Sequence, residues 1–251
     1  MHARSFLQIA WVVGMLSTAV AVAQDFRLES EITLSGEKKP IAENLTLFVG
    51  NVVYDFSLVG SNEITIFDPA REQFVLLDVD RDMRLTLTTR QVLEINRAIR
   101  GAADDRDPFF FEPQFEESYE DQEKLLTLSN KRIKYSAKGI VADQQSIRRQ
   151  YRNFADWYAR LNATRPGTMP PFARLELNKS MAGHGIVPEE VNLTIYPSNR
   201  LLGRKTEVTS KHLFAWRILE TDRNRIERAN QHRATFEEVS FRTYRGLEKS
   251  E

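Results

Sequence analysis

Apolar residues alternate with polar ones, or gather in short blocks, along the first third of the chain, and this pattern predicts β-strands. From Asp25 to Leu34 the apolar residues Phe26, Leu28, Ile32 and Leu34 share one face and mostly charged residues the other, as in a strand with one face in solvent. Further blocks follow, separated by spacers rich in Gly, Asn, Asp and Pro: Leu45–Val49, Val52–Leu58, Glu63–Asp68, Gln73–Asp78 and Arg84–Thr88. Such short spacers join antiparallel neighbours, so we expect an antiparallel meander.

The middle strands of this meander are apolar at consecutive positions, so both of their faces should be covered, or one should line a cavity. If a cavity is present, the residues expected to line it and to bind a ligand are Tyr54, Phe56, Ile66, Phe74 and Leu76. For each of these side chains, ordinary core packing is the competing interpretation.

A helix is expected to begin at Thr88, because Thr88 and Gln91 can form a capping box and apolar residues then recur at helical spacing. Gly101 is the expected end of this helix. A second apolar stripe, which includes Ile147, Tyr151, Phe154 and Tyr158, predicts a helix over Gln144–Asn162. Further strands are expected at Leu125–Ser129, Ile133–Lys138, Val191–Tyr196 and Glu207–Ile218. A further helix is expected from Thr221 or Asp222 to about Ala234, followed by one more helical turn within Phe236–Gly246. This order of elements indicates an α+β fold, formed by a single domain over 24–251.

Residues 1–23 have the layout of a secretory signal peptide, with a basic start, an apolar stretch and a small-x-small cleavage site ending at Ala23. We therefore expect export to the periplasm or the medium, without a later membrane-spanning segment. The chain has 35 basic and 35 acidic residues, and losing Arg4 would leave 34 against 35, a balance that argues against a nucleic-acid partner. Cysteine is absent, which excludes disulfides and an acylated N-terminal cysteine.

The segment Asp104–Lys124 combines many acidic residues with the aromatic residues Phe109, Phe110, Phe111, Phe115 and Tyr119. One interpretation is a long surface loop whose aromatic side chains fix it to the core. The other is a mobile lid or a segment that binds a partner protein of the cell envelope, since clustered exposed aromatic residues mark interaction surfaces.

No motif predicts a metal, a cofactor or a catalytic centre. Asp78, Asp80 and Asp82 have the spacing that opens a calcium loop, but Met83 and Thr89 occupy the positions that require Gly and Glu, so we expect a turn between strands. His184 and His212 are not spaced to share a metal ion. A hydrolase whose catalytic residues come from distant parts of the chain stays an alternative, because such sites are defined by geometry rather than by spacing.

The stretch from Ile64 to Phe74, with Phe67-Asp68-Pro69 before Gln73-Phe74, resembles the strand–turn–strand of periplasmic lipoprotein carrier proteins. The resemblance implies a large, curved antiparallel sheet, like half of a barrel, with helices packed on one face and acyl chains shielded between the two. Asp104–Lys124 has no counterpart in that pattern, and no functional residue of the family can be matched here.

These observations predict a non-catalytic exported protein that binds an apolar or lipidic ligand between a curved sheet and its helices. The alternatives are a structural or partner-binding envelope protein that uses 104–124, and the dispersed hydrolase.

Overall fold

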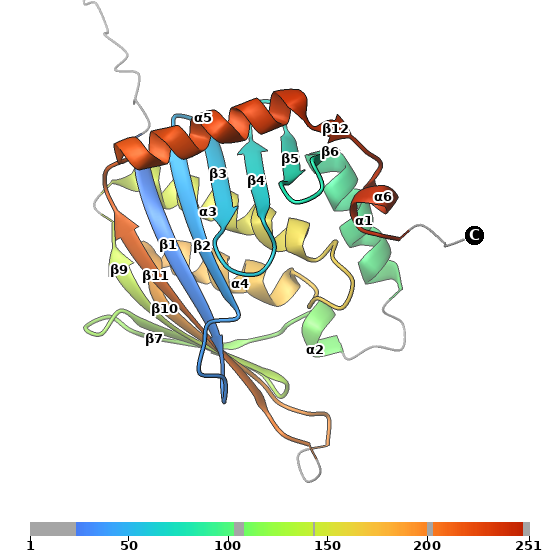
Figure 1. Ribbon diagram of the computed structural model, residues 1–251. Helices are drawn as coiled ribbons and strands as arrows, with labels where there is room; N and C mark the ends of the chain where they lie inside the picture. Colours follow the sequence, from blue (N-terminus) through green and yellow to red (C-terminus); the bar gives the residue numbers. More distant parts are fainter. Residues whose placement is uncertain (1–23, 103–107, 143, 200–202, 248–251) are drawn as a thin grey trace, which may run out of the picture.

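The computed structural model describes residues 24–102, 108–142, 144–199 and 203–247, and within them twelve strands form one sheet (Figure 1). The strand order is β12-β6-β5-β4-β3-β2-β1-β11-β10-β9-β8-β7. Neighbouring strands are antiparallel except for the short parallel pair of β12 and β6. The sheet curves around α3 and α4 without closing into a barrel, so the expected α+β fold with a large curved sheet is confirmed.

The expected meander is present with nearly the predicted bounds. Its strands are β1 (Phe26–Leu34), β2 (Ala42–Val49), β3 (Val52–Ser57), β4 (Glu63–Asp68), β5 (Gln73–Asp78) and β6 (Met83–Thr88). The backbone N–H of Arg81 donates to the Asp78 carboxylate at 3.0 Å, so the Asp78–Asp82 stretch is a turn between strands, as expected. β1 pairs with β2 on one side and with β11 on the other, which joins the meander to the second half of the sheet.

The second half of the sheet consists of β7 (Glu116–Glu120), β8 (Leu125–Ser129), β9 (Ile133–Val141), β10 (Ile186–Ile195) and β11 (Thr206–Ala215). β7 corrects the interpretation of 104–124 as a loop, because five of its residues pair with β8 at the edge of the sheet. Its side chains are almost all polar or charged, as is common where an edge strand meets solvent, and this composition hid the strand from a hydrophobic pattern.

One face of the sheet, here called the inner face, is covered by α1 (Thr89–Gly101), α3 (Gln145–Asn162) and α4 (Phe172–Gly183). The capping box predicted for α1 is present, since the Thr88 hydroxyl accepts from the Gln91 N–H and the Gln91 side chain accepts from the Thr88 N–H. α3 packs the predicted stripe, including Ile147, Tyr151 and Phe154, against the meander.

The opposite face, here called the outer face, carries α5 (Glu220–Thr235), which lies across the ends of the meander strands (Figure 1). Ala229 and Ile226 of this helix pack against the apolar side chains that β2 to β5 present outward. The expectation that helices occupy only one face therefore needs correction. The middle strands are apolar on both faces because helices cover both faces, and a ligand cavity is not required to explain the pattern.

After α5 the chain passes around the β6 edge of the sheet. β12 (Glu237–Glu238) pairs with β6, and α6 (Phe241–Tyr244) then places Tyr244 in the core of the inner face. The remaining helix, α2 (Pro108–Phe111), is a single turn next to α4.

Within the described residues, no helix is both long and apolar enough to cross a membrane. The predicted signal peptide, residues 1–23, lies outside the described residues.

Candidate binding cavity

The five residues predicted to line a ligand site are all buried, but they do not share one face of the sheet. Tyr54, Phe56 and Ile66 point outward and pack in the core beneath α5. Phe74 and Leu76 point inward and pack in the core beneath α1 and α3. No single cavity can therefore contact all five, and each of them contributes to ordinary core packing in this structure.

A cavity of about 200 Å³ lies instead between the inner face and the helices α3 and α4. Its apolar wall includes Leu28 and Ile32 from β1 and Phe154 from α3. Its polar residues come from six elements and were not among the predicted site residues: Ser30, Asn44, Thr46, Asp55, Tyr151, Tyr158, Asn162, Arg174, Ser210 and His212. Polar groups converging in a partly apolar hollow are the usual mark of a binding site.

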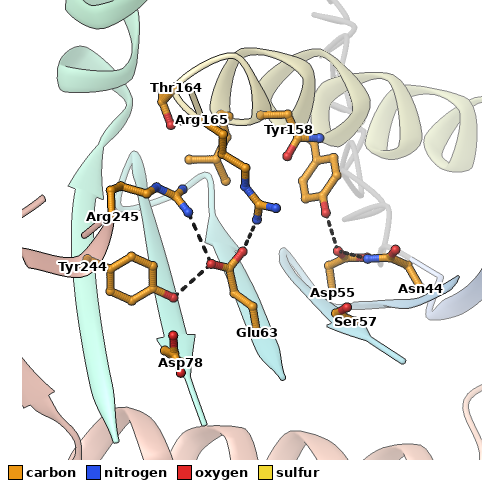
Figure 2. A network of polar contacts seen from close by, with 12 residues as sticks. Asn44, Asp55, Ser57, Glu63, Asp78, Tyr158, Thr164, Arg165, Tyr244 and Arg245 are labelled. Carbon is orange, nitrogen blue, oxygen red and sulfur yellow. Dashed lines mark hydrogen bonds and ion pairs between the residues drawn. The ribbon is translucent and has the colours of Figure 1, made fainter. Parts of the chain in front are cut away.

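Asp55 of β3 forms one end of this polar lining and is only 3% exposed. Figure 2 shows Asn44 and Tyr158 converging on its carboxylate, to which they donate at 2.8 and 2.7 Å. Thr46 donates to the other carboxylate oxygen at 2.6 Å. Burial raises the pKa of Asp55, and the three hydrogen bonds oppose that shift. Burial also raises the pKa of Tyr158 well above its usual value, so this hydroxyl stays protonated and donates a hydrogen bond to Asp55.

His212 of β11 lies between two serine hydroxyls in the same cavity. Its Nδ1 is 2.9 Å from Ser30 Oγ, and its Nε2 is 3.1 Å from Ser210 Oγ. Burial, with a smaller contribution from the positive charge of Arg174, lowers the pKa of His212 to about 3. The imidazole is therefore neutral at physiological pH and serves as one donor and one acceptor.

Arg174 of α4 brings a positive charge to this cavity. Its Nε donates to Asn178 Oδ1 at 3.0 Å, and the Asn178 amide donates to Asp156 at 2.9 Å. This chain of hydrogen bonds along α3 and α4 orients the guanidinium group. None of the ion pairs among the described residues involves Arg174, so its charge is not neutralised by a directly bonded carboxylate.

Four half-buried apolar side chains extend the inner face beyond the cavity, and we call them the apolar strip: Ile32, Leu34, Ile195 and Val208. Leu34 lies opposite Val208 in the pairing of β1 with β11, and Ile32 also lines the cavity. None of the four packs into the hydrophobic cores described above. Figure 1 shows the ends of β1, β10 and β11 reaching past the helices. Because Ile32 belongs to the strip and also lines the cavity, the strip adjoins the cavity.

A second polar network lies beside Asp55 and fixes the C-terminal segment. Glu63 of β4 contacts Arg165 with one carboxylate oxygen, and with the other it accepts from Tyr244 at 3.1 Å and contacts Arg245 at 3.4 Å (Figure 2). Burial and the Glu63 charge raise the pKa of Tyr244, so its hydroxyl stays a donor. This network joins β4, the end of α3 and the C-terminal segment, which is a structural role.

The aromatic residues proposed as a partner-binding surface mostly contact the protein itself. Phe111 is buried against Phe172, with ring centroids 6.1 Å apart. Phe115 lies edge-on to Tyr135, and Tyr119 stacks on His184 with centroids 3.8 Å apart. Phe110 lies under the Arg132 guanidinium, and Phe109 is half-buried. These contacts support the interpretation in which the aromatic side chains fix the segment to the core.

His184 belongs to a separate cluster at the β7 edge, away from the cavity. Its Nε2 is 2.8 Å from Glu117, whose other oxygen accepts from Ser180 at 2.6 Å. Both contacts lower the pKa of Glu117. Ser180 and His184 each contact the carboxylate rather than each other, so the order of contacts differs from that of a serine hydrolase. Among the described residues, no three metal-ligating side chains come together.

Besides a hollow of about 350 Å³ beside Phe48 and Phe67, the described structure has two still larger hollows. One, of about 520 Å³, has a charged lining that includes Glu29, Glu43 and Lys211, and it shares Ser30, Asn44 and His212 with the candidate cavity. The other, of about 530 Å³, is an apolar groove beside α2. None of these three hollows is lined by Asp55, Tyr158 or Arg174, which is why we take the smaller cavity as the candidate site.

A search against protein-family models finds no match to this chain, and a search of curated proteins finds no similar sequence. The site is therefore interpreted from its own geometry.

Proposed function

We propose that this is an exported, non-catalytic protein that binds an apolar or lipidic ligand between the inner face of its sheet and the helices α3 and α4. The observation that supports the proposal most directly is that the apolar strip adjoins the cavity. A ligand with an apolar body and a polar end would place the body on Ile32, Leu34 and Val208, and the end among the hydrogen-bonding groups of the cavity.

The volume of the cavity agrees with this division of the ligand. Sites for whole drug-sized ligands measure roughly 300–1,000 Å³, so about 200 Å³ is suited to one end of a longer molecule. The remainder of the ligand would cover the apolar strip, whose side chains are otherwise left half-exposed to water.

Two variants on one strand test the proposal. Val208→Glu places a charge on the apolar strip, and Leu213→Glu places the same charge on the outer face of β11, where Leu213 is 66% exposed. Protein expressed from the full chain would be extracted with organic solvent, analysed by mass spectrometry, and titrated with a fluorescent fatty acid. We expect ligand to co-purify with the wild type and Leu213→Glu, and to be lost in Val208→Glu. Equal binding by both variants, or no ligand in any of the three proteins, would refute the proposal.

The hydroxyl–imidazole contacts of His212 favour a second candidate, the dispersed hydrolase, with Ser30 as nucleophile. Its weakness is the low pKa of His212, because an imidazole that resists protonation is a poor general base. The second ring nitrogen is also bonded to Ser210 rather than to a carboxylate that would stabilise the imidazolium ion. Ester hydrolysis that disappears in both Ser30→Ala and His212→Ala would establish this candidate.

A further inference from the structure

We infer that the polar end of the ligand is an anion, and that Arg174 binds it inside the cavity. The inference rests on the proposed function, and it adds the chemical class of the ligand: a chain-bearing carboxylate or phosphate rather than a neutral or cationic lipid.

The first step is the unbalanced charge of Arg174. Its guanidinium group is half-buried at the cavity wall, with Nε occupied by the amide oxygen of Asn178. The carboxylate behind that amide, Asp156, reaches Arg174 only through Asn178. The other carboxylate of the cavity, Asp55, is already bonded by three donors, Asn44, Thr46 and Tyr158. A partly buried guanidinium without a bonded carboxylate is a favourable partner for an incoming carboxylate or phosphate.

The second step is the set of neutral groups around that charge. The hydroxyl groups of Tyr151, Ser30 and Ser210 line the same cavity. Neutral His212 accepts from one of the two serines, so the other serine and Tyr151 can each donate a hydrogen bond to a ligand. His212 is neutral, and its two ring nitrogens hold the hydroxyl groups of Ser30 and Ser210 in place. A site with one cation and neutral hydrogen-bond donors is suited to an anionic ligand end. A cationic ligand end would be repelled by Arg174, and a neutral ligand end would leave the charge of Arg174 uncompensated.

The third step is the direction of the apolar strip. Ile32 belongs both to the cavity lining and to the strip, so an anion held at Arg174 would have its chain led outward along β1 and β11. Fatty acids and phosphate-bearing lipids share this layout of an anionic end and an apolar chain. The structure favours their common chemistry, and the experiment distinguishes between the two.

The test compares three probes of equal chain length: dodecanoate, dodecyl phosphate and dodecanol. Each would be titrated calorimetrically at pH 7.5 into delipidated protein from the full chain. We expect wild type to bind at least one of the two anions about ten- to a hundredfold more tightly than dodecanol, the range expected for a hydrogen bond to a charged group. Arg174→Gln should lose that preference while still binding dodecanol, and Arg174→Lys should retain part of it.

Lys179→Gln is the matched control, because it removes one positive charge from the same helix at a side chain that is 67% exposed. It should leave all three affinities unchanged. Thermal unfolding of each variant would confirm that it is folded. The preferred anion, dodecanoate or dodecyl phosphate, identifies the type of ligand.

Two results would overturn the inference in different ways. If wild type binds dodecanol as tightly as both anions, and Arg174→Gln changes none of the affinities, the protein binds apolar chains but the anion site is wrong. If wild type binds none of the three probes, and no lipid co-purifies, the proposed function fails as well.

Discussion

The buried carboxylate of Asp55 allows a sharp prediction about pH and stability. The folded protein holds the Asp55 proton to a higher pH than the unfolded chain, in which the pKa is about 3.8. The folded state therefore binds more protons in the window above pH 3.8, so Asp55 makes stability fall as pH rises through that window. Above the folded pKa this cost is constant, at about 1.4 kcal/mol for each unit by which the two pKa values differ.

Asp55→Asn should remove this cost while keeping the hydrogen bonds. The Asn oxygen can accept from Asn44 and Tyr158, as Oδ2 does now, and its amide can donate to a rotated Thr46 hydroxyl. We expect the variant to be at least as stable as wild type at pH 8, with an advantage that shrinks as pH falls towards 4. Asp55→Ala should instead be destabilised, by about 1–3 kcal/mol for each donor left unpaired.

Urea denaturation of wild type and both variants, measured from pH 4 to pH 8, checks this reasoning. The informative quantity is the difference in unfolding free energy between Asp55→Asn and wild type at each pH, because other titrating groups cancel in it. If Asp55→Asn is less stable than wild type at pH 8 and the gap narrows on acidification, the ionised carboxylate is stabilising and the argument from burial is wrong.

Three further predictions concern other parts of the fold. His212 stays neutral in the folded protein down to about pH 3, while the same residue in the unfolded chain takes up a proton near pH 6.5, so the unfolding free energy should fall by up to about 1.4 kcal/mol per pH unit as pH falls between these values. His212→Gln should flatten this pH dependence in urea denaturation, and an unchanged dependence would refute the prediction. Glu63→Ala leaves Arg165 and Arg245 without their shared carboxylate and should lower the unfolding free energy by about 3 kcal/mol, the low end for a broken buried pair because the Arg165 side chain is 36% exposed. A decrease below about 1 kcal/mol in chemical denaturation would contradict this prediction. Thr88→Ala removes the helix cap and should lower the unfolding free energy by about 1 kcal/mol, seen as a lower urea midpoint with an unchanged slope; an unchanged midpoint would show that the cap contributes little.

Local patterns predicted most of the elements well, because their signals lie within a few residues of each other. β4 and β5 have the predicted bounds, and the capping box of Thr88 and Gln91 begins α1 as expected. The turn at Asp78 also follows from local chemistry, since a side chain that bonds the backbone three residues on needs no tertiary partner.

The candidate site was not predicted, because its residues are distant in sequence. Asp55 is a single charge within the apolar strand Val52–Ser57, which was the one local signal that could have identified it. Tyr158 was expected only as part of the apolar stripe of its helix, and no motif in the sequence pointed to Arg174. The contact of His212 with Ser30 spans 182 residues, so no spacing rule could have found it.

The sequence by itself determined the antiparallel meander, the helices that follow it and the α+β class, because periodicity, turn residues and caps act over short distances. Only the tertiary structure decided which face of each strand is covered and by which helix. α5 occupies the outer face, so residues such as Tyr54 and Phe74, two predicted partners in one site, are separated by the sheet. The tertiary structure also places Asp55, Arg174 and His212, from three different elements, around one cavity. Only the pairing of β1 with β11 and the packing of α3 and α4 bring these distant segments together.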